Sequence, residues 1–140
     1  MTDTIPSESY HPKIMVVTME RSSYVAADAL GQLHLEYPPS VYIVKTILPA
    51  VLPAYFYVDS LKKGIDGIII ASGGSDCPVE KAFTVLSETV KKAQALMKAE
   101  DIPAKRLRLV AICSVCTSAL LKEISQMTNT LRRFKAEGKL

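Results

Sequence analysis

The chain has 140 residues, of which 49% are hydrophobic and 22% are charged, and this composition is typical of one globular domain with its own core. Its formal net charge of +3 is small, and no basic run is interleaved with aromatic residues, so we expect no nucleic-acid partner. Three cysteines are too few for a disulfide scaffold in a chain of this size.

The first half of the chain predicts two strand–helix units. An apolar run predicts a strand at Lys13–Thr18, and the small residues that follow predict a helix at Ser23–Leu35. The β-branched run Val41–Leu48 predicts the second strand. A short helix at Pro53–Lys63 completes the second unit, and Gly64 is expected at its C-terminal cap.

The second half repeats this order twice. The apolar run Gly67–Ala71 predicts a strand that is buried on both faces. A long helix is expected from Pro78 to about Ala99, because its apolar residues recur at three- and four-residue steps. The run Arg106–Ile112 predicts the fourth strand, and the last helix is expected to begin near Cys116.

Four strand–helix units in alternation predict an α/β fold. We expect a single domain over residues 13–140, preceded by a polar arm at residues 1–12. Its four-stranded parallel sheet should carry helices on both faces, in a flavodoxin-like or Rossmann-like arrangement. The order of the strands in the sheet is left open.

No feature of the sequence predicts export or a membrane span. The N-terminal residues lack the charged and apolar regions of a signal peptide. The most apolar long stretch, residues 46–58, contains two prolines and is shorter than the ~20 residues that a membrane span requires. We therefore expect a cytoplasmic protein.

The glycine loop after the third predicted strand is the first candidate site. Gly73 and Gly74 would let the backbone approach a cofactor, and Cys77 is expected at the N-cap of the following helix. There the helix N-terminus would lower the pKa of the Cys77 thiol, which could then react or bind a metal. The alternative is that the glycines only form the turn and Cys77 is a small capping residue.

The pair Cys113 and Cys116 follows the fourth predicted strand, at the same edge of the sheet. Two cysteines at this spacing can form a redox dithiol or half of a metal site. Alternatively, Cys113 still belongs to the strand core and the cysteines are structural, which we favour because no second pair or paired histidine completes a zinc site.

Two segments are candidates for a partner surface, because aromatic residues and arginine are favoured at interfaces. One is the aromatic run that contains Tyr55, and the other is the basic end of the last helix. The residues of that basic end are Arg132, Arg133, Phe134 and Lys135. Core packing and simple solvation are the alternatives.

Four motifs along residues 13–125 resemble those of a known family. They are Ser23-Tyr24 with Ala27-Asp28, Tyr37-Pro38-Pro39, Lys63-Gly64-Ile65-Asp66-Gly67, and Ile102-Pro103-Ala104-Lys105-Arg106-Leu107-Arg108-Leu109. In this order they resemble the delta, or MvhD-type, subunit of methyl-viologen-reducing hydrogenase, which docks on heterodisulfide reductase and related electron-bifurcating complexes.

The resemblance implies a small α/β domain with one [2Fe–2S] cluster. Such a domain relays electrons from a hydrogenase or dehydrogenase module to an HdrA-like reductase subunit that carries flavin and iron–sulfur groups. The cysteine positions of the family fall, in this chain, on residues that are mostly not cysteine. These residues are Thr18, Met19, Ser22 and Cys77, and two further cysteine positions of the family fall near Leu48 and Gly73.

Because a [2Fe–2S] centre needs four good ligands, normally thiolates, we expect no cofactor. The leading hypothesis is a structural adaptor, not catalytic alone, in a cytoplasmic oxidoreductase complex. Its partner would lie against the former cluster edge and the last helix. One alternative is an electron carrier whose rebuilt iron–sulfur cluster uses Cys77, Cys113, Cys116 and one further ligand. Another is a free-standing thiol redox protein that uses Cys113 and Cys116.

Overall fold

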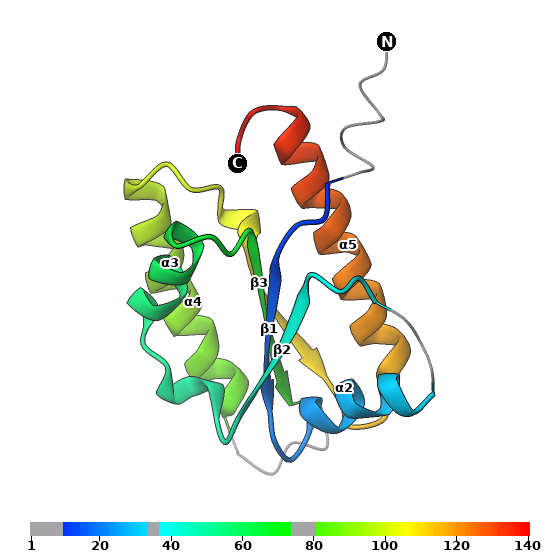
Figure 1. Cartoon of the computed structure of the whole chain (residues 1–140). Coiled ribbons are helices and arrows are strands. Elements are labelled where there is room, and N and C mark those ends of the chain that lie inside the picture. Colours follow the sequence, from blue (N-terminus) through cyan, green and yellow to red (C-terminus); the bar gives the residue numbers. More distant parts are fainter. Residues whose placement is uncertain (1–9, 34–36, 74–80) are drawn as a thin grey trace.

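The structure of the protein, a computed structural model, describes residues 10–33, 37–73 and 81–140. Strands and helices alternate along it, as predicted (Figure 1). The strands are β1 (Ile14–Met19), β2 (Val41–Thr46), β3 (Gly67–Gly73) and β4 (Leu107–Ile112). The α-helices are α2 (Ser23–Gln32), α3 (Ala54–Lys62), α4 (Ala82–Ala99) and α5 (Thr117–Ala136), and the 3₁₀ helices are η1 (Pro49–Val51) and η2 (Ala104–Arg106).

The four strands form one parallel sheet in the order β2-β1-β3-β4. This is the order of the first four strands of a flavodoxin-like sheet, and it differs from the Rossmann order, in which the second strand lies between the first and the third. Every residue of β1 and β3 is buried, whereas β2 and β4, at the two edges, contain exposed residues. The unbroken apolar run in β3 therefore reflects burial on both faces, as expected.

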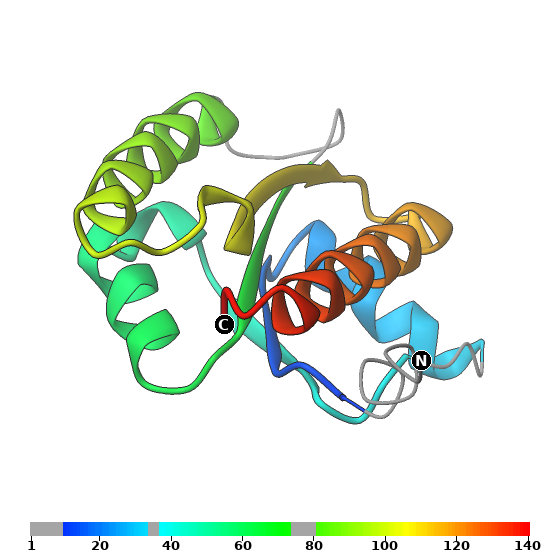
Figure 2. The same cartoon turned by 90° about the horizontal axis from the view of Figure 1, so that it is seen from above.

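Helices cover both faces of the sheet, as Figure 2 shows from above, and each face has its own core. On one face, α2 and α5 pack against β1, β3 and β4 through buried residues such as Leu30, Ile69 and Leu131. On the other face, α3 and α4 pack through residues such as Tyr57, Ile70 and Met97. The prediction of an α/β domain with helices on both faces is confirmed. Within the described ranges, none of the helices is long and apolar enough to cross a bilayer.

Two element boundaries differ from the sequence prediction around the glycine loop. β3 continues past Ala71 to Gly73, because Ser72 and Gly73 still pair with β4. α4 begins at Ala82 rather than at Pro78, because Lys81 has the left-handed φ of 61°, which a right-handed helix cannot contain. Lys81 is thus the N-cap residue of α4, and Cys77, which was predicted to cap this helix, lies outside the described residues.

The amino-terminal edge of the sheet is closed by hydrogen bonds around Asp66. The Tyr10 hydroxyl and the Lys13 N–H donate to one Asp66 carboxylate oxygen at 2.6 and 2.9 Å, and Arg106 Nε donates to the Asp66 carbonyl oxygen at 2.6 Å. Burial, with the bond to Asp66, raises the pKa of Tyr10, and burial lowers the pKa of Arg106. Arg132 Nε donates to the Tyr10 carbonyl oxygen at 3.0 Å. These bonds fix the segment that leads into β1.

Candidate functional site

The carboxyl ends of the four strands meet at one edge, at the lower end of the sheet in Figure 1. In a sheet of this order the chain turns in opposite directions after β1 and after β3, so these two neighbours diverge beyond their last pair. β1 pairs with β2 up to Met19 opposite Thr46, but with β3 only up to Val17 opposite Ile70. The cleft position typical of ligand sites in such sheets is therefore the space between the ends of β1 and β3.

Ser23, the first residue of α2, fills the position where β1 and β3 diverge. Its hydroxyl accepts a 2.8 Å hydrogen bond from the Met19 N–H and donates a 2.6 Å bond to the Ala71 carbonyl oxygen. Ser23 is fully buried. A side chain thus connects the two strands beyond the point where their backbone ladder ends.

Two further serines at this position have buried hydroxyls that find no hydrogen-bond partner among the described residues. They are Ser22, the N-cap residue of α2, and Ser72 in β3, and both are fully buried. Buried hydroxyls normally have a partner, because an unpaired one costs free energy. Sequence reasoning identified Ser22 only through the family resemblance and did not identify Ser72, since a serine in an apolar strand carries no signal of its own.

The described residues at the expected cluster positions do not fit an iron–sulfur centre. The Thr18 hydroxyl already donates to the Val44 carbonyl oxygen at 2.9 Å, and Met19 is buried in the core. Ser22 offers a hydroxyl where the cluster needs a thiolate, and the side chain of Leu48 has no atom that could bind iron. Among the described residues, no three His, Cys, Asp or Glu side chains are grouped so that they could hold a metal ion. Gly73 ends β3, while Gly74 and Cys77 lie outside the described residues.

Cys113 and Cys116 are joined by a disulfide, with their Cα atoms 5.1 Å apart. β4 ends at Ile112, so Cys113 is the first residue after the strand, and the expectation that it belongs to the strand core is wrong. Cys116 is the N-cap residue of α5, and its N–H donates to the Cys113 carbonyl oxygen at 3.1 Å. The tight turn brings the two sulfur atoms together. While the disulfide is intact, neither sulfur can serve as a thiolate ligand.

The connections at this edge expose large apolar side chains. Val115, inside the disulfide loop, is 84% exposed, and Ile47, directly after β2, is 82% exposed. Val51 and Tyr55 follow in η1 and α3 and are 71% and 69% exposed. Exposed apolar residues gathered on one side of a domain are typical of a protein–protein contact. The sequence analysis identified Tyr55 but not the other three residues. Ile47 and Val51 could have been identified, because they lie two residues on either side of Pro49.

Beneath this connection, Tyr57 of α3 is fully buried. Its hydroxyl donates a long hydrogen bond of 3.4 Å to the Pro49 carbonyl oxygen. Burial raises the pKa of Tyr57 to about 12, because the phenolate form would lose its hydration.

The basic end of α5 lies at the opposite edge of the sheet, because α5 runs antiparallel to the strands (Figure 1). Arg132 holds the Tyr10 carbonyl there, and the Lys135 ammonium lies 5.3 Å from the centre of the Tyr10 ring. The ring of Phe134 packs in the core, with Arg133 5.9 Å from its centre. The two segments expected to bind a partner, Tyr55 and the end of α5, are therefore not brought together.

Comparisons with known proteins relate the chain to subunits of hydrogenases and heterodisulfide reductases. A family model described as methyl-viologen-reducing hydrogenase, delta subunit, matches residues 14–135. An iron-sulfur subunit of the F420-non-reducing hydrogenase from Archaeoglobus profundus is 30% identical over 106 residues, which cover 74% of this chain and 76% of that subunit. The corresponding vhu iron-sulfur subunit from Methanococcus voltae is 21% identical over 123 residues, which cover 87% of this chain and 92% of the relative.

A different kind of relative is much longer than this chain. It is a subunit of the ferredoxin/F420H2-dependent CoB-CoM heterodisulfide reductase from Methanosarcina acetivorans, and it is 25% identical over 138 residues. The match covers 93% of this chain but only 16% of that reductase subunit. The chain thus corresponds to one segment of the larger protein.

Proposed function

Because the chain belongs to the family of the delta subunit of methyl-viologen-reducing hydrogenase, we propose that it is an accessory subunit of a cytoplasmic electron-transfer complex of the heterodisulfide reductase type. It would act as a structural adaptor without catalytic activity of its own. Its partners would be an HdrA-like subunit with flavin and iron–sulfur groups and a hydrogenase or dehydrogenase module.

One observation carries the proposal. Nearly the whole of this chain, 93%, is matched by a segment that makes up 16% of a long heterodisulfide reductase subunit, while relatives of about its own length are separate hydrogenase subunits. The same domain therefore occurs both as a separate hydrogenase subunit and inside a reductase subunit. This is the pattern expected of a module that contacts the reductase.

We further propose that the domain no longer carries the cluster of its relatives. The described positions between β1 and β3 offer hydroxyls and a thioether where a [2Fe–2S] centre needs thiolates. The exposed side chains of Ile47, Val51, Tyr55 and Val115 would then form the contact with the partner at the same edge. The adaptor would keep the docking surface of the family without the redox group behind it.

Iron and sulfide analysis of anaerobically purified protein tests the loss of the cluster. We expect neither element in stoichiometric amount, and one [2Fe–2S] per chain would contradict the adaptor. In that case Cys77→Ser, Cys113→Ser and Cys116→Ser would show whether these residues and one further ligand hold a rebuilt cluster. Each true ligand should reduce the absorbance between about 400 and 500 nm when it is replaced.

Co-expression with an HdrA-like subunit that lacks a segment of this kind tests the docking surface. We expect the two proteins to co-purify, and Ile47→Arg to weaken the complex by about tenfold or more, since a charge would enter an apolar contact. Leu96→Arg is the matched control, because Leu96 is 46% exposed on α4 and away from the carboxyl edge. Equal effects of the two variants would contradict docking at this edge.

The disulfide favours thiol–disulfide exchange as a second candidate function. One thiolate of a partner dithiol would attack a sulfur atom of the Cys113–Cys116 bond and form a mixed disulfide, which the second partner thiolate would then cleave. The partner dithiol would become a disulfide. Its two protons would pass to Cys113 and Cys116, which would then be free thiols.

A synthetic dithiol peptide, Cys-Gly-Pro-Cys, tests this candidate. The oxidised protein should convert one equivalent of peptide to the disulfide form. The variant Cys113→Ser/Cys116→Ser, which retains Cys77, should convert none. If the unaltered protein leaves the peptide reduced, the candidate fails.

A further inference from the structure

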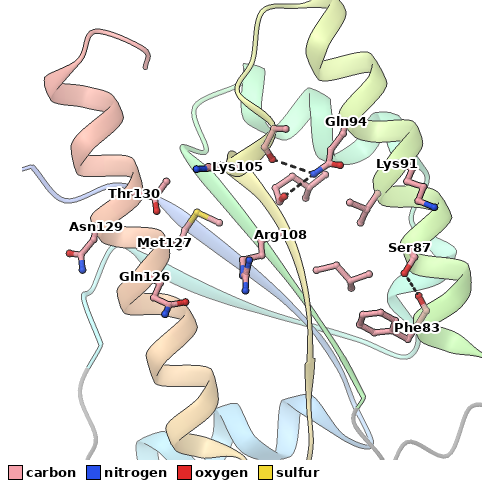
Figure 3. Close-up of a pocket in the computed structure, with 14 residues that line it drawn as sticks. Phe83, Ser87, Lys91, Gln94, Lys105, Arg108, Gln126, Met127, Asn129 and Thr130 are labelled. Carbon is pink, nitrogen blue, oxygen red and sulfur yellow. Dashed lines mark hydrogen bonds between the residues drawn. The ribbon is translucent and has the colours of Figure 1, made fainter.

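The outer edge of β4 lies in a groove between two helices. In the described part of the chain, no strand pairs with β4 on the side away from β3. α4 and α5, which cover opposite faces of the sheet, form the walls of the groove, and β4 forms its floor (Figure 3). The groove encloses about 770 Å³.

Alternate residues of β4 direct their backbone groups into this groove, on the side where no described strand pairs with β4. The Leu107 carbonyl oxygen faces outward, since it accepts a 3.4 Å hydrogen bond from Gln94 Nε2 of α4. Within a strand, the N–H and C=O of one residue point to the same side, and successive residues alternate. Leu109 and Ala111 must therefore also present their N–H and C=O groups outward, while Arg108 and Val110 bond to β3.

The side chains around this edge are basic and polar. Lys91 of α4, Lys105 of η2 and Arg108 of β4 are exposed and line the groove, and no acidic side chain is among the described residues that line it. The Glu123 carboxylate meets Arg108 at 2.6 Å, which leaves the two lysines without an acidic partner among the ion pairs of the described residues. Phe83, 43% exposed on α4, adds an apolar wall at one end.

We propose that this groove binds an extended acidic segment of a partner protein, which adds a fifth strand to the sheet beside β4. Strand addition to an open edge is a common mode of peptide recognition, in which backbone hydrogen bonds supply affinity and flanking side chains supply specificity. The basic lining selects carboxylate side chains on the added strand. This proposal does not depend on the proposed function, because the groove lies at the β4 edge and not at the carboxyl ends of the strands.

A second copy of this chain is a poorer occupant. Pairing of two β4 edges about a twofold axis would bring the basic linings of two identical grooves toward each other. Like charges directly opposite each other in paired strands are destabilising. Basic residues on an open edge also deter pairing between identical chains.

The test uses two synthetic peptides of about eight residues, a length that spans one strand. One alternates valine and glutamate, and the other alternates valine and lysine. The full chain should bind the acidic peptide and not the basic one, as measured by fluorescence anisotropy. In hydrogen exchange, the Leu109 and Ala111 amides should exchange rapidly in the free protein and become protected by the acidic peptide, whereas Arg108 and Val110 are already protected.

Charge reversal locates the binding. Lys91→Glu/Lys105→Glu should weaken binding of the acidic peptide by roughly tenfold, because two attractive contacts become repulsive. The matched control is Lys92→Glu/Lys98→Glu, which makes the same change in net charge on exposed residues of α4 outside the groove.

Three results of the peptide experiments would overturn the proposal. They are no binding of the acidic peptide, equal weakening by the two double variants, or no added protection at Leu109 and Ala111. Ala111→Pro gives an independent check, since it removes an outward N–H while keeping the ladder to β3, and it should abolish peptide binding in a folded protein. A dimer that dissociates in Ala111→Pro would assign the groove to a second copy and also overturn the proposal.

Discussion

The hydroxyl of Ser23 donates a 2.6 Å hydrogen bond to the carbonyl oxygen of Ala71, so a side chain of α2 takes the place of a strand partner for β3. The Ser23 hydroxyl oxygen also accepts a 2.8 Å bond from the Met19 N–H, which places it between the diverging ends of β1 and β3. The separation of the two strands at the candidate site is thus built into the start of α2. It does not require a bound group.

Ser23→Ala should lower the free energy of unfolding by about 1–3 kcal/mol, because two hydrogen bonds are lost in a fully buried position. Urea unfolding followed by circular dichroism measures the change. Ser118→Ala is the control, since Ser118 is exposed on α5 and its loss should change stability by less than about 0.5 kcal/mol. Equal stabilities of the two variants would show that the Ser23 bridge contributes nothing to the fold.

Gly67→Ala should also destabilise the protein, because α5 packs directly against the start of β3. A Cβ at position 67 would lie 2.7 Å from Leu131 Cδ1 and 2.9 Å from Met127 Sδ, both in the core. Overpacking of this kind costs about 1–3 kcal/mol. The matched control is Gly31→Ala in α2, where a new Cβ meets nothing within 4 Å and should be neutral or stabilising. Similar stabilities of the two variants would contradict the close approach of α5.

Alkylation counts the free thiols and so tests the disulfide. Denatured without a reductant, the protein should take up one iodoacetamide group, on Cys77, and after reduction it should take up three. Mass spectrometry distinguishes the two states. In Cys113→Ser, the released Cys116 should raise the number without reductant to two. Three groups on unreduced protein would show that the bond is absent.

Much of the fold could be predicted, because the spacing of apolar residues in the sequence follows which side of each helix or strand is buried. The apolar run of β3 and the three- and four-residue spacing in α5 indicated the type of each element. The C-cap residue of α3 is Lys63, one residue earlier than predicted, and Gly64, with φ of 123°, follows it. The start of α4 could not be predicted in this way. Pro78 is a favourable first helical residue by local preference, but the left-handed conformation of Lys81 places the start at Ala82.

The candidate site was less accessible from sequence, because its geometry depends on strand order. Cys113 and Cys116 were identified from their spacing, and the structure joins them. The buried hydroxyl of Ser72 and the bridge made by Ser23 are recognised only once β1 and β3 are known to be neighbours. β4 has an open edge because it is the last strand of the sheet. That position cannot be predicted from the six residues of β4 alone.

Tyr57 should make the protein less stable above pH 10. Burial raises its pKa in the folded state to about 12 from the usual 10.0. Below pH 10 the phenol is protonated in both states, so the full stability is present. Between pH 10 and about 12 the unfolded chain releases this proton and the folded chain does not, so the free energy of unfolding falls.

Urea unfolding from about pH 9 to about pH 12 measures that decline, which Tyr57→Phe should make shallower. Part of the decline should persist in this variant, because the pKa of Tyr10 is raised too and acts in the same direction. Tyr55→Phe is the control, since the Tyr55 side chain is exposed, and it should leave the decline unchanged. If Tyr57→Phe follows the same curve as the unaltered protein, the Tyr57 hydroxyl is hydrated in solution and the closed packing of α3 over η1 is incorrect.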